Sequence, residues 1–275
     1  MEAESFKKVS PKIFYESFLE KSVRPDGREM NDCRSILVAP GNINTSQGSC
    51  IVRIGQTAMI CGLKLEPVKH SGEINETGNI DVSVMLSPLC STKFNVGKPS
   101  AESVALSQYL HDLCVNSLID LSDLVIIPKK YVWTLHADLI CLDYDGNAID
   151  TATYALYGAL KTLQIPKVEE NVDGELIFDY DHCSQLALMN KIHSQTFGFF
   201  NQYIISDPTS FEEDIMTDRV TIVLGFDNKI LTICKPGNEV LEVEDIKDLI
   251  TSMKKKNNEI FSLFDKLDTL HSKEE

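Results

Sequence analysis

The stretch from Tyr131 to Leu163 constrains the fold more than any other part of the sequence. Residues 131–142 alternate between two faces, one of them aromatic and aliphatic, which predicts a strand with one buried side. Residues 143–147 contain an Asp-Gly pair and predict a tight turn, with Asn147 as the cap of the next element. Apolar residues then recur at helical spacing, and Pro166 forbids continuation. We therefore expect a strand, an acidic turn and a helix.

Upstream of this stretch, the sequence predicts several strands and another helix. The text is strand-like from Cys33 to Pro67, with a hairpin connection at Gly55-Gln56, and again from Ile80 to Leu86. A helix is expected from about Ser100 to Ile119, with Val104 on the stripe that faces the core. A short amphipathic helix precedes all of these elements.

The second half partly repeats this order. Strands are expected over Leu186–His193, 197–200 and 203–206, followed by a hairpin that turns at Asp227-Asn228. A long amphipathic helix follows over Val243–Leu270. Two successive units of strands and helices, in which hairpins outnumber crossovers, indicate the α+β class, with mixed sheets that helices cover on one side.

The expected organisation has four parts. An N-terminal helix and arm occupy residues 1–31, a first subdomain residues 32–167, a linker residues 168–184, and a second subdomain with the C-terminal helix residues 185–275. The linker is placed at an acidic, glycine-bearing stretch that follows the predicted helix. The KKKNNE segment at Lys254–Glu259 is interpreted as a solvated helix face.

The composition excludes some classes of protein. The net charge of the 275 residues is -15, whereas a free-standing nucleic-acid binder usually has a basic excess. Eight cysteines occur without a CxxC pair, which indicates reduced thiols in a cytosolic or nuclear protein. The sequence has neither an apolar run of membrane-spanning length nor a signal-peptide core, so we expect no membrane association.

Four aspartates gather around the central turn. Asp143, Asp145 and Asp150 suit turn and helix N-terminus chemistry better than a metal or acid–base cluster. Asp138 lies in the predicted buried strand near His136, and a small-molecule enzyme using this pair remains a hypothesis. Zinc-ligand spacing and phosphate-loop or hydrolase motifs do not occur. We expect no metal and no cofactor.

Several cations could contact an anion. Arginines in turns are more often surface or salt-bridge residues, so this role competes with a structural one. The candidates are Arg24, Arg28, Arg34, Arg53, Lys64, Lys93 and Lys98.

Four segments together resemble the RNase PH family, and within it the ring subunits of the eukaryotic RNA exosome. They are RPDGR at 24–28, GSCIVRIGQTAMICGLKLE in the first strand pair, PLCSTKF at 88–94 and DLICLDYDGNAIDTATYALYGALKTLQIP at 138–166. The resemblance spans nearly the whole chain. It implies an RNase PH-like fold, in which two subdomains of sheet plus helices, of the ribosomal protein S5 domain 2-like kind, pack together.

The resemblance also implies where a site should be. Active members hold inorganic phosphate with arginines and use paired acids at an RNA 3′ end, because several cations must converge on anionic reactants. Pro99, beside Lys98, replaces one expected arginine, and Ile149 replaces another. An ungapped count puts Glu213 and Arg219 at the two acid positions, with Asp218 one residue away.

These departures imply a non-catalytic subunit of the exosome core ring that supports 3′-5′ RNA processing and degradation. Implied partners are RNase PH-like neighbours in a six-membered ring, S1/KH cap proteins, a separate hydrolytic ribonuclease and RNA in the channel. Implied locations are nucleus, nucleolus and cytoplasm. An active phosphate-dependent exoribonuclease is the alternative. The RNA-contact candidates are Lys93, Lys98, Arg53 and Lys64.

Overall fold

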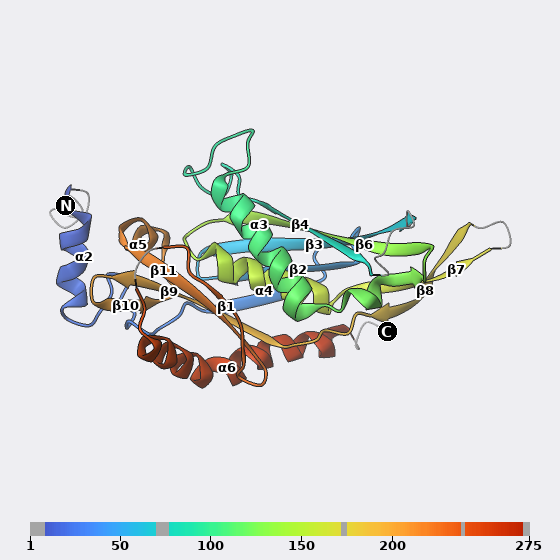
Figure 1. Cartoon of the computed structure of the whole chain (residues 1–275). Coiled ribbons are helices and arrows are strands. Elements are labelled where there is room, and N and C mark those ends of the chain that lie inside the picture. The colour runs from blue at the N-terminus through green and yellow to red at the C-terminus, as the bar shows by residue number, and fades with distance from the viewer. Residues whose placement is uncertain (1–8, 70–76, 172–174, 238–239, 272–275) are drawn as a thin grey trace.

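A six-stranded sheet forms the first half of the computed structural model, which describes residues 9–69, 77–171, 175–237 and 240–271 (Figure 1). The strand order is β1-β2-β3-β6-β4, with β5 beside β6, and only the β4–β6 pairing is parallel. The predicted hairpin connects β2 to β3. The strands are β1 (Ile36–Pro40), β2 (Gly48–Ile54), β3 (Thr57–Lys69), β4 (Asn79–Met85), β5 (Val125–Ile127) and β6 (Tyr131–Asp143).

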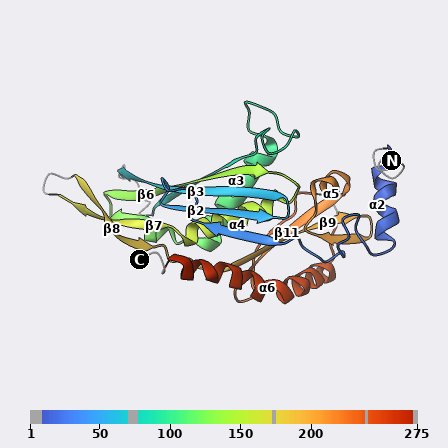
Figure 2. The ribbon, with the colours of Figure 1, turned by 180° about the vertical axis from the view of Figure 1, so that it is seen from behind.

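Helices cover one face of this sheet, and the view from behind shows the other face open (Figure 2). Helix α4 (Ala148–Lys161) packs on β2 and β3, while α3 (Ala101–Leu113) packs beside β4. Almost every residue of α4 is buried, so the helix lies inside the core. The predicted position of Val104 is wrong, because this side chain is 58% exposed. Helix α3 ends at Leu113 and continues as a short π-helix, Cys114–Leu118, before the 3-10 turn η2 at Leu121–Leu124.

A four-stranded antiparallel sheet forms the second half, in the order β10-β9-β11-β12. The predicted strand over Leu186–His193 is wrong, since β9 begins only at Ile192 and continues to Phe200. The predicted turn at Asp227-Asn228 does connect β11 to β12. The remaining elements here are β10 (Tyr203–Ser206), β11 (Asp218–Gly225), β12 (Ile230–Cys234), α5 (Ser210–Ile215) and α2 (Pro11–Leu19).

Helix α6 (Val243–His271) joins the two halves, because it contacts β9, β1 and α4 (Figure 1). Its Phe264 ring lies 5.0 Å from the Tyr157 ring of α4, measured between centroids. Asn257 is only 4% exposed, so the interpretation of Lys254–Glu259 as a solvated face is wrong at that residue. The sheets, with helices packed on one side, confirm the expected α+β fold class.

A two-stranded ribbon projects from the far end of the first sheet (Figure 1). It consists of β7 (Gln164–Glu170) and β8 (Leu176–Gln185), and its tip at 172–174 lies outside the described residues. Most of the expected linker over residues 168–184 is paired as strand in this ribbon, which the sequence pattern did not predict. Phe178 anchors the ribbon, with its ring 6.0 Å from that of Trp133.

All eight cysteines are free thiols, and most are buried. Within the described part of the chain, no helix has the length and apolar character needed to cross a membrane.

Candidate functional site

The turn after β6 holds the two halves of the molecule together. Gly146 has φ +75°, and a Cβ atom there would lie 2.4 Å from the backbone nitrogen of Ser210 at the start of α5. Asn147 is the N-cap residue of α4, as predicted, but its side chain makes no capping bond: its side-chain amide donates to Asp207 at 2.6 Å, and its backbone N–H donates to Glu213 at 2.9 Å. Only a residue without a side chain fits at Gly146, so the turn packs directly on α5.

A cavity of about 500 Å³ opens beside this turn, and we name it the Ile149 cavity. Its walls come from α3, the first turn of α4, the end of α5 and the start of β11. Ile149, Glu213 and Arg219, which the family resemblance assigned to the phosphate and acid positions, therefore converge here from segments far apart in the sequence. The lining residues are Lys93, Glu102, Ala105, Leu106, Tyr109, Ala148, Ile149, Glu213, Met216, Thr217, Asp218, Arg219, Thr221, Cys234, Pro236 and Gly237.

The wall formed by α3 and α4 is largely apolar. Ile149 stands there together with Ala148, Ala105 and Leu106. None of these side chains has a hydrogen-bond donor or a charge, and an anion requires several donors that point at it. These four side chains therefore cannot bind phosphate, and the polar groups that α3 adds to the lining are the Glu102 carboxylate and the Tyr109 hydroxyl.

The cations around the cavity face carboxylates of the same chain. Arg219 Nη1 lies 3.7 Å from a Glu213 oxygen and 4.0 Å from a Glu102 oxygen. Lys235 Nζ lies 2.5 Å from Asp218 Oδ2. Each contact reduces the positive potential that a bound anion would need. At the outer edge, Lys93 also faces a carboxylate, that of Asp214 at 3.6 Å.

Gly237 makes the pairing between Lys235 and Asp218 possible. A Cβ atom at Gly237 would lie 1.9 Å from Asp218 Oδ1. The backbone after Lys235 must therefore approach the carboxylate more closely than any other residue type allows, and the Lys235 amine also donates to the Gly237 carbonyl at 3.0 Å. The segment from Lys235 to Gly237 thus closes one end of the cavity.

Glu213 is buried and already holds two hydrogen bonds. The Tyr144 hydroxyl donates to Oε2 at 2.6 Å, and the Asn147 backbone N–H donates to Oε1 at 2.9 Å. Burial raises the pKa of Glu213 above its usual value, although these two donors and Arg219 oppose the rise. The carboxylate is held as part of the wall, where both oxygens are engaged.

The other predicted residues lie outside the Ile149 cavity. Lys98 and Pro99 are exposed and line a separate hollow with Lys93, which is the one residue of that loop shared with the cavity. Arg53 and Lys64 are exposed on β2 and β3, on the sheet face away from α4. These RNA-contact candidates do not converge on one point.

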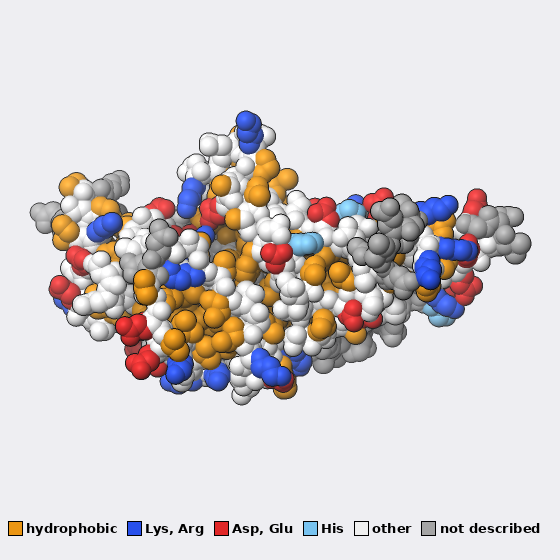
Figure 3. Space-filling view, in the orientation of Figure 1, with side chains coloured by type: hydrophobic (Ala, Val, Ile, Leu, Met, Phe, Trp, Pro, Cys, Tyr) orange, Lys and Arg blue, Asp and Glu red, His pale blue; other side chains and the backbone are white. Residues whose placement is uncertain are grey.

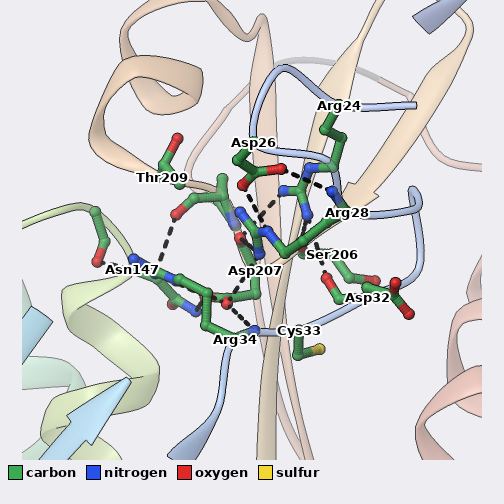
Figure 4. A network of polar contacts seen from close by, with 12 residues as sticks. Arg24, Asp26, Arg28, Asp32, Cys33, Arg34, Asn147, Ser206, Asp207 and Thr209 are labelled. Atoms are coloured by element: carbon green, nitrogen blue, oxygen red, sulfur yellow. Dashed lines mark hydrogen bonds and ion pairs between the residues drawn. The ribbon is translucent and has the colours of Figure 1, made fainter. Parts of the chain in front are cut away.

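The arginines of the RPDGR segment form a structural network, shown in Figure 4. Arg24 is 1% exposed and donates to both Glu212 oxygens at 2.9 Å and to the Ser206 carbonyl at 2.8 Å. Arg28 donates to Asp26 at 2.6 Å. We call these residues, with Arg34 and Asp207, the arginine cluster. The competing salt-bridge role of the arginines in this turn is confirmed.

Arg34 completes the arginine cluster at the central turn. It donates to Asp207 through Nε at 2.9 Å and Nη2 at 2.8 Å, and to the Asp145 carbonyl at 2.8 Å. Burial opposes ionisation of Asp207, but the hydrogen bonds and charge of Arg34 lower its pKa below the usual value. The guanidinium nitrogens of Arg34 all donate to groups inside the protein.

Two aspartates differ from their predicted surroundings. Asp138 is exposed, because it lies on the outer pleat of β6 between the buried Ala137 and Leu139, so no enclosed site with His136 exists. Asp150 is 2% exposed and accepts from the Ser194 hydroxyl at 2.6 Å and the Thr196 N–H at 2.7 Å. Its carboxylate links α4 to β9 and does not serve the helix N-terminus alone.

No metal site emerges from these carboxylates. In the described ranges, no group of three or more His, Cys, Asp or Glu side chains is arranged to hold a metal ion.

Comparison with known proteins agrees with this architecture. The exosome complex component rrp43 of Schizosaccharomyces pombe is 37% identical over 234 residues, covering 84% of this chain and 87% of that protein. The exosome complex component Rrp42 of Saccharolobus solfataricus is 32% identical over 231 residues, covering 84% of each. A chain from the Archaeoglobus fulgidus exosome with RNA bound to the active site superimposes with a TM-score of 0.81 at 26% identity, covering 92% of this chain and 97% of that one.

The family profiles divide the chain in two. The profile for domain 1 of the 3′ exoribonuclease family matches residues 32–166, and the profile for domain 2 matches residues 193–256. The first match contains the sheet with α3 and α4, and the second contains β9, β11, β12 and part of α6. The chain belongs to the RNase PH family of 3′ exoribonucleases.

Proposed function

We propose that this protein is a non-catalytic subunit of the core ring of an RNA exosome, where it supports 3′-5′ processing and degradation of RNA. The observation that carries the proposal is the Ile149 cavity. It lies where the family resemblance places the phosphate site, yet Ile149 has no donor and Arg219 faces two carboxylates. Phosphorolysis needs unpaired cations at this point, since both reactants are anions.

The relatives support the ring part of the proposal. Both curated relatives are named as exosome complex components, and the superimposed chain belongs to an exosome. We infer that this chain likewise assembles with RNase PH-like neighbours into a six-membered ring, beneath S1/KH cap proteins and next to a separate hydrolytic ribonuclease. An acidic chain suits this role, because protein neighbours supply the basic groups that RNA in the channel requires. The expected locations are the nucleus, nucleolus and cytoplasm.

We also propose the domain boundaries that the family resemblance implies. A first subdomain over residues 32–167 and a second over residues 185–275 each supply one sheet, and the arm at residues 1–31 carries the arginine cluster's Arg24 and Arg28. Lys93, Lys98, Arg53 and Lys64 remain the proposed RNA contacts.

Co-purification tests the ring assignment. The full chain is co-expressed with candidate RNase PH-like partners, and native mass spectrometry measures the stoichiometry. We expect one copy per closed ring, and no ring when this chain is omitted. A correctly folded chain that stays monomeric with every such partner present contradicts the assignment.

A phosphorolysis assay tests the non-catalytic assignment separately. A 5′-labelled RNA tail is incubated with the isolated chain and with the ring, with and without inorganic phosphate. We expect no phosphate-dependent shortening by the isolated chain. Shortening that requires phosphate and disappears in Glu213→Gln favours the alternative, an active exoribonuclease that uses Glu213 and Asp218.

A further inference from the structure

A second cavity, of about 280 Å³, lies between α4, β9, α6 and the segment that precedes β1. It shares no lining residue with the Ile149 cavity. We name it the Gln195 cavity. Its residues take no part in the function proposed above, apart from those that also belong to the arginine cluster. The lining residues are Cys33, Arg34, Ser35, Ile36, Ile54, Asn147, Asp150, Tyr154, His193, Ser194, Gln195, Asp207, Lys256, Glu259, Ile260 and Leu263.

Two buried amide groups distinguish this cavity. Asn147 is 2% exposed and Gln195 is 3% exposed. The nitrogen of Asn147 donates to the Asp207 carboxylate at 2.6 Å, which fixes the orientation of that amide, and the nitrogen of Gln195 donates to the Cys33 sulfur at 3.4 Å. Their oxygens, Asn147 Oδ1 and Gln195 Oε1, have no hydrogen-bond partner among the described residues.

These two oxygens favour a ligand that donates hydrogen bonds. A buried acceptor without a hydrogen-bond partner destabilises the folded chain by roughly 1–3 kcal/mol. A ligand that donates an N–H to each of the two oxygens would remove this cost, and its binding free energy would be more favourable by that amount. A primary amino group is the smallest neutral group with two N–H donors on one atom.

The surroundings disfavour a charged ligand of either sign. Burial and, to a smaller extent, the nearby Lys256 ammonium lower the pKa of His193 to about 4 against the opposing hydrogen bond with Asn257, so a cation is poorly tolerated there. Burial also raises the pKa of Asp150 to about 6, so added negative charge is unfavourable too. Only a neutral ligand avoids both costs.

Charged side chains of both signs, Arg34, Lys256 and Glu259 among them, also line the cavity, but part of its wall is apolar and suits a flat ring. Ile54, Tyr154 and Ile260 line the cavity and are 3%, 1% and 8% exposed. A cavity with apolar walls and a few convergent polar atoms is the usual form of a small-molecule site.

We propose that the Gln195 cavity binds a neutral, flat ligand that carries a primary amino group, the class to which the adenine and cytosine rings belong. The amino group donates to Asn147 Oδ1 and Gln195 Oε1, and the ring lies against the apolar walls. The proposal goes beyond the ring assignment and does not depend on it, because every residue used belongs to this chain.

Paired nucleosides test the chemistry. The full chain is titrated with adenosine and cytidine, and with inosine and uridine, in which an oxygen replaces the amino group. We expect the amino-bearing nucleosides to bind at least about tenfold more tightly by calorimetry. Absence of binding, which leaves ordered water as the partner of both oxygens, overturns the proposal, and so does equal binding within each pair.

A matched pair of variants locates the binding. Gln195→Met keeps the side-chain length and removes the acceptor, so adenosine should bind about tenfold more weakly. Gln202→Met makes the same change at an exposed turn residue and should leave binding unaltered. Equal affinities in the two variants contradict the site.

One measurement avoids the risk that Gln195→Met fails to fold. In the unaltered protein, adenosine should shift the NMR resonances of the Asn147 and Gln195 side-chain amides, whereas inosine should not. Unshifted amides under saturating adenosine overturn the proposal. Ring assembly is scored separately by native mass spectrometry, so either proposal can fail without the other.

Discussion

The arginine cluster and the Ile149 cavity both set arginines against carboxylates, but with very different geometry. In the cluster, Arg24 makes several hydrogen bonds of 2.8 to 2.9 Å to Glu212 and the Ser206 carbonyl, and its side chain is fully buried. In the cavity, Arg219 approaches its two carboxylates only to 3.7 and 4.0 Å, and its side chain is 32% exposed.

This difference separates two uses of the same residue types. Short, multiple bonds fix the arm and the second sheet to each other, and the guanidinium donors of Arg24 and Arg34 are engaged within the protein. The longer contacts around Arg219 contribute little to the stability of the fold. They lower the positive electrostatic potential of the cavity but leave its volume open. Geometry, and not the number of arginines, therefore decides which region contributes stability and which could bind an anion.

The largest effect is expected in the arginine cluster. Arg24→Met removes the cation that hydrogen-bonds the buried Glu212 carboxylate and leaves only Arg28, 3.7 Å away, so the free energy of unfolding should fall by about 3–5 kcal/mol in urea titrations. Arg53→Met is the matched control, because Arg53 faces Asp143 at 3.6 Å on the exposed sheet face and should change stability by less than about 1 kcal/mol. If both variants lost the same free energy of unfolding, the buried arginine cluster would contribute no more stability than an exposed ion pair.

Asp150 lies outside the arginine cluster and Asp207 lies inside it, and their contributions to the free energy of unfolding should change with pH in opposite directions. Arg34 lowers the pKa of Asp207, whereas Asp150 has no arginine and burial raises its pKa to about 6. A raised carboxyl pKa means that the folded protein binds more protons than the unfolded chain between about pH 4 and 6, so this group favours folding as the pH falls.

The variant Asp150→Asn removes this term. At pH 7 the charged Asp150 costs up to about 3 kcal/mol, from a shift of roughly two pH units. The stability difference between Asp150→Asn and the unaltered protein should therefore be largest near neutral pH and shrink toward about pH 4.5. Urea titrations across this range measure it, and a difference that is constant with pH contradicts the assigned protonation.

The smallest effect concerns the Ile149 cavity itself. Ile149→Arg places a guanidinium on the apolar wall, where the family resemblance puts a phosphate-binding arginine, and phosphate should then bind at least about tenfold more tightly than to the unaltered chain. Ile149→Met is the control without charge. Phosphate-dependent shifts in thermal unfolding report the binding, and equal shifts in both variants would show that the wall does not set anion affinity.

Periodicity predicted most elements, since the alternation in β6 and the helical spacing in α4 survive in the fold. The ribbon was missed, because β7 and β8 pair across an acidic, glycine-bearing stretch that resembles a linker. Val104 was misplaced because the spacing on α3 marks an apolar stripe but not which neighbour covers it.

The site was predicted in part. Ile149 and Glu213 do line one cavity, as the resemblance implies. The closure of that cavity by Lys235 depends on the close approach of Gly237 to Asp218, a backbone contact that residue types alone do not reveal. Asp150 was interpreted as turn chemistry, because its partners lie on β9, more than forty residues away.

The position of helix α6 late in the sequence determines when the core of the first sheet can be completed during synthesis. Ile260 and Phe264 belong to the core of the first sheet, although every strand of that sheet leaves the ribosome before them. Until α6 emerges, the aromatic side chains of Tyr154 and Tyr157 that meet Phe264 have no cover from it. The first half therefore completes its fold only after α6 has been synthesised, and until then this surface is available to chaperones that shield nascent chains.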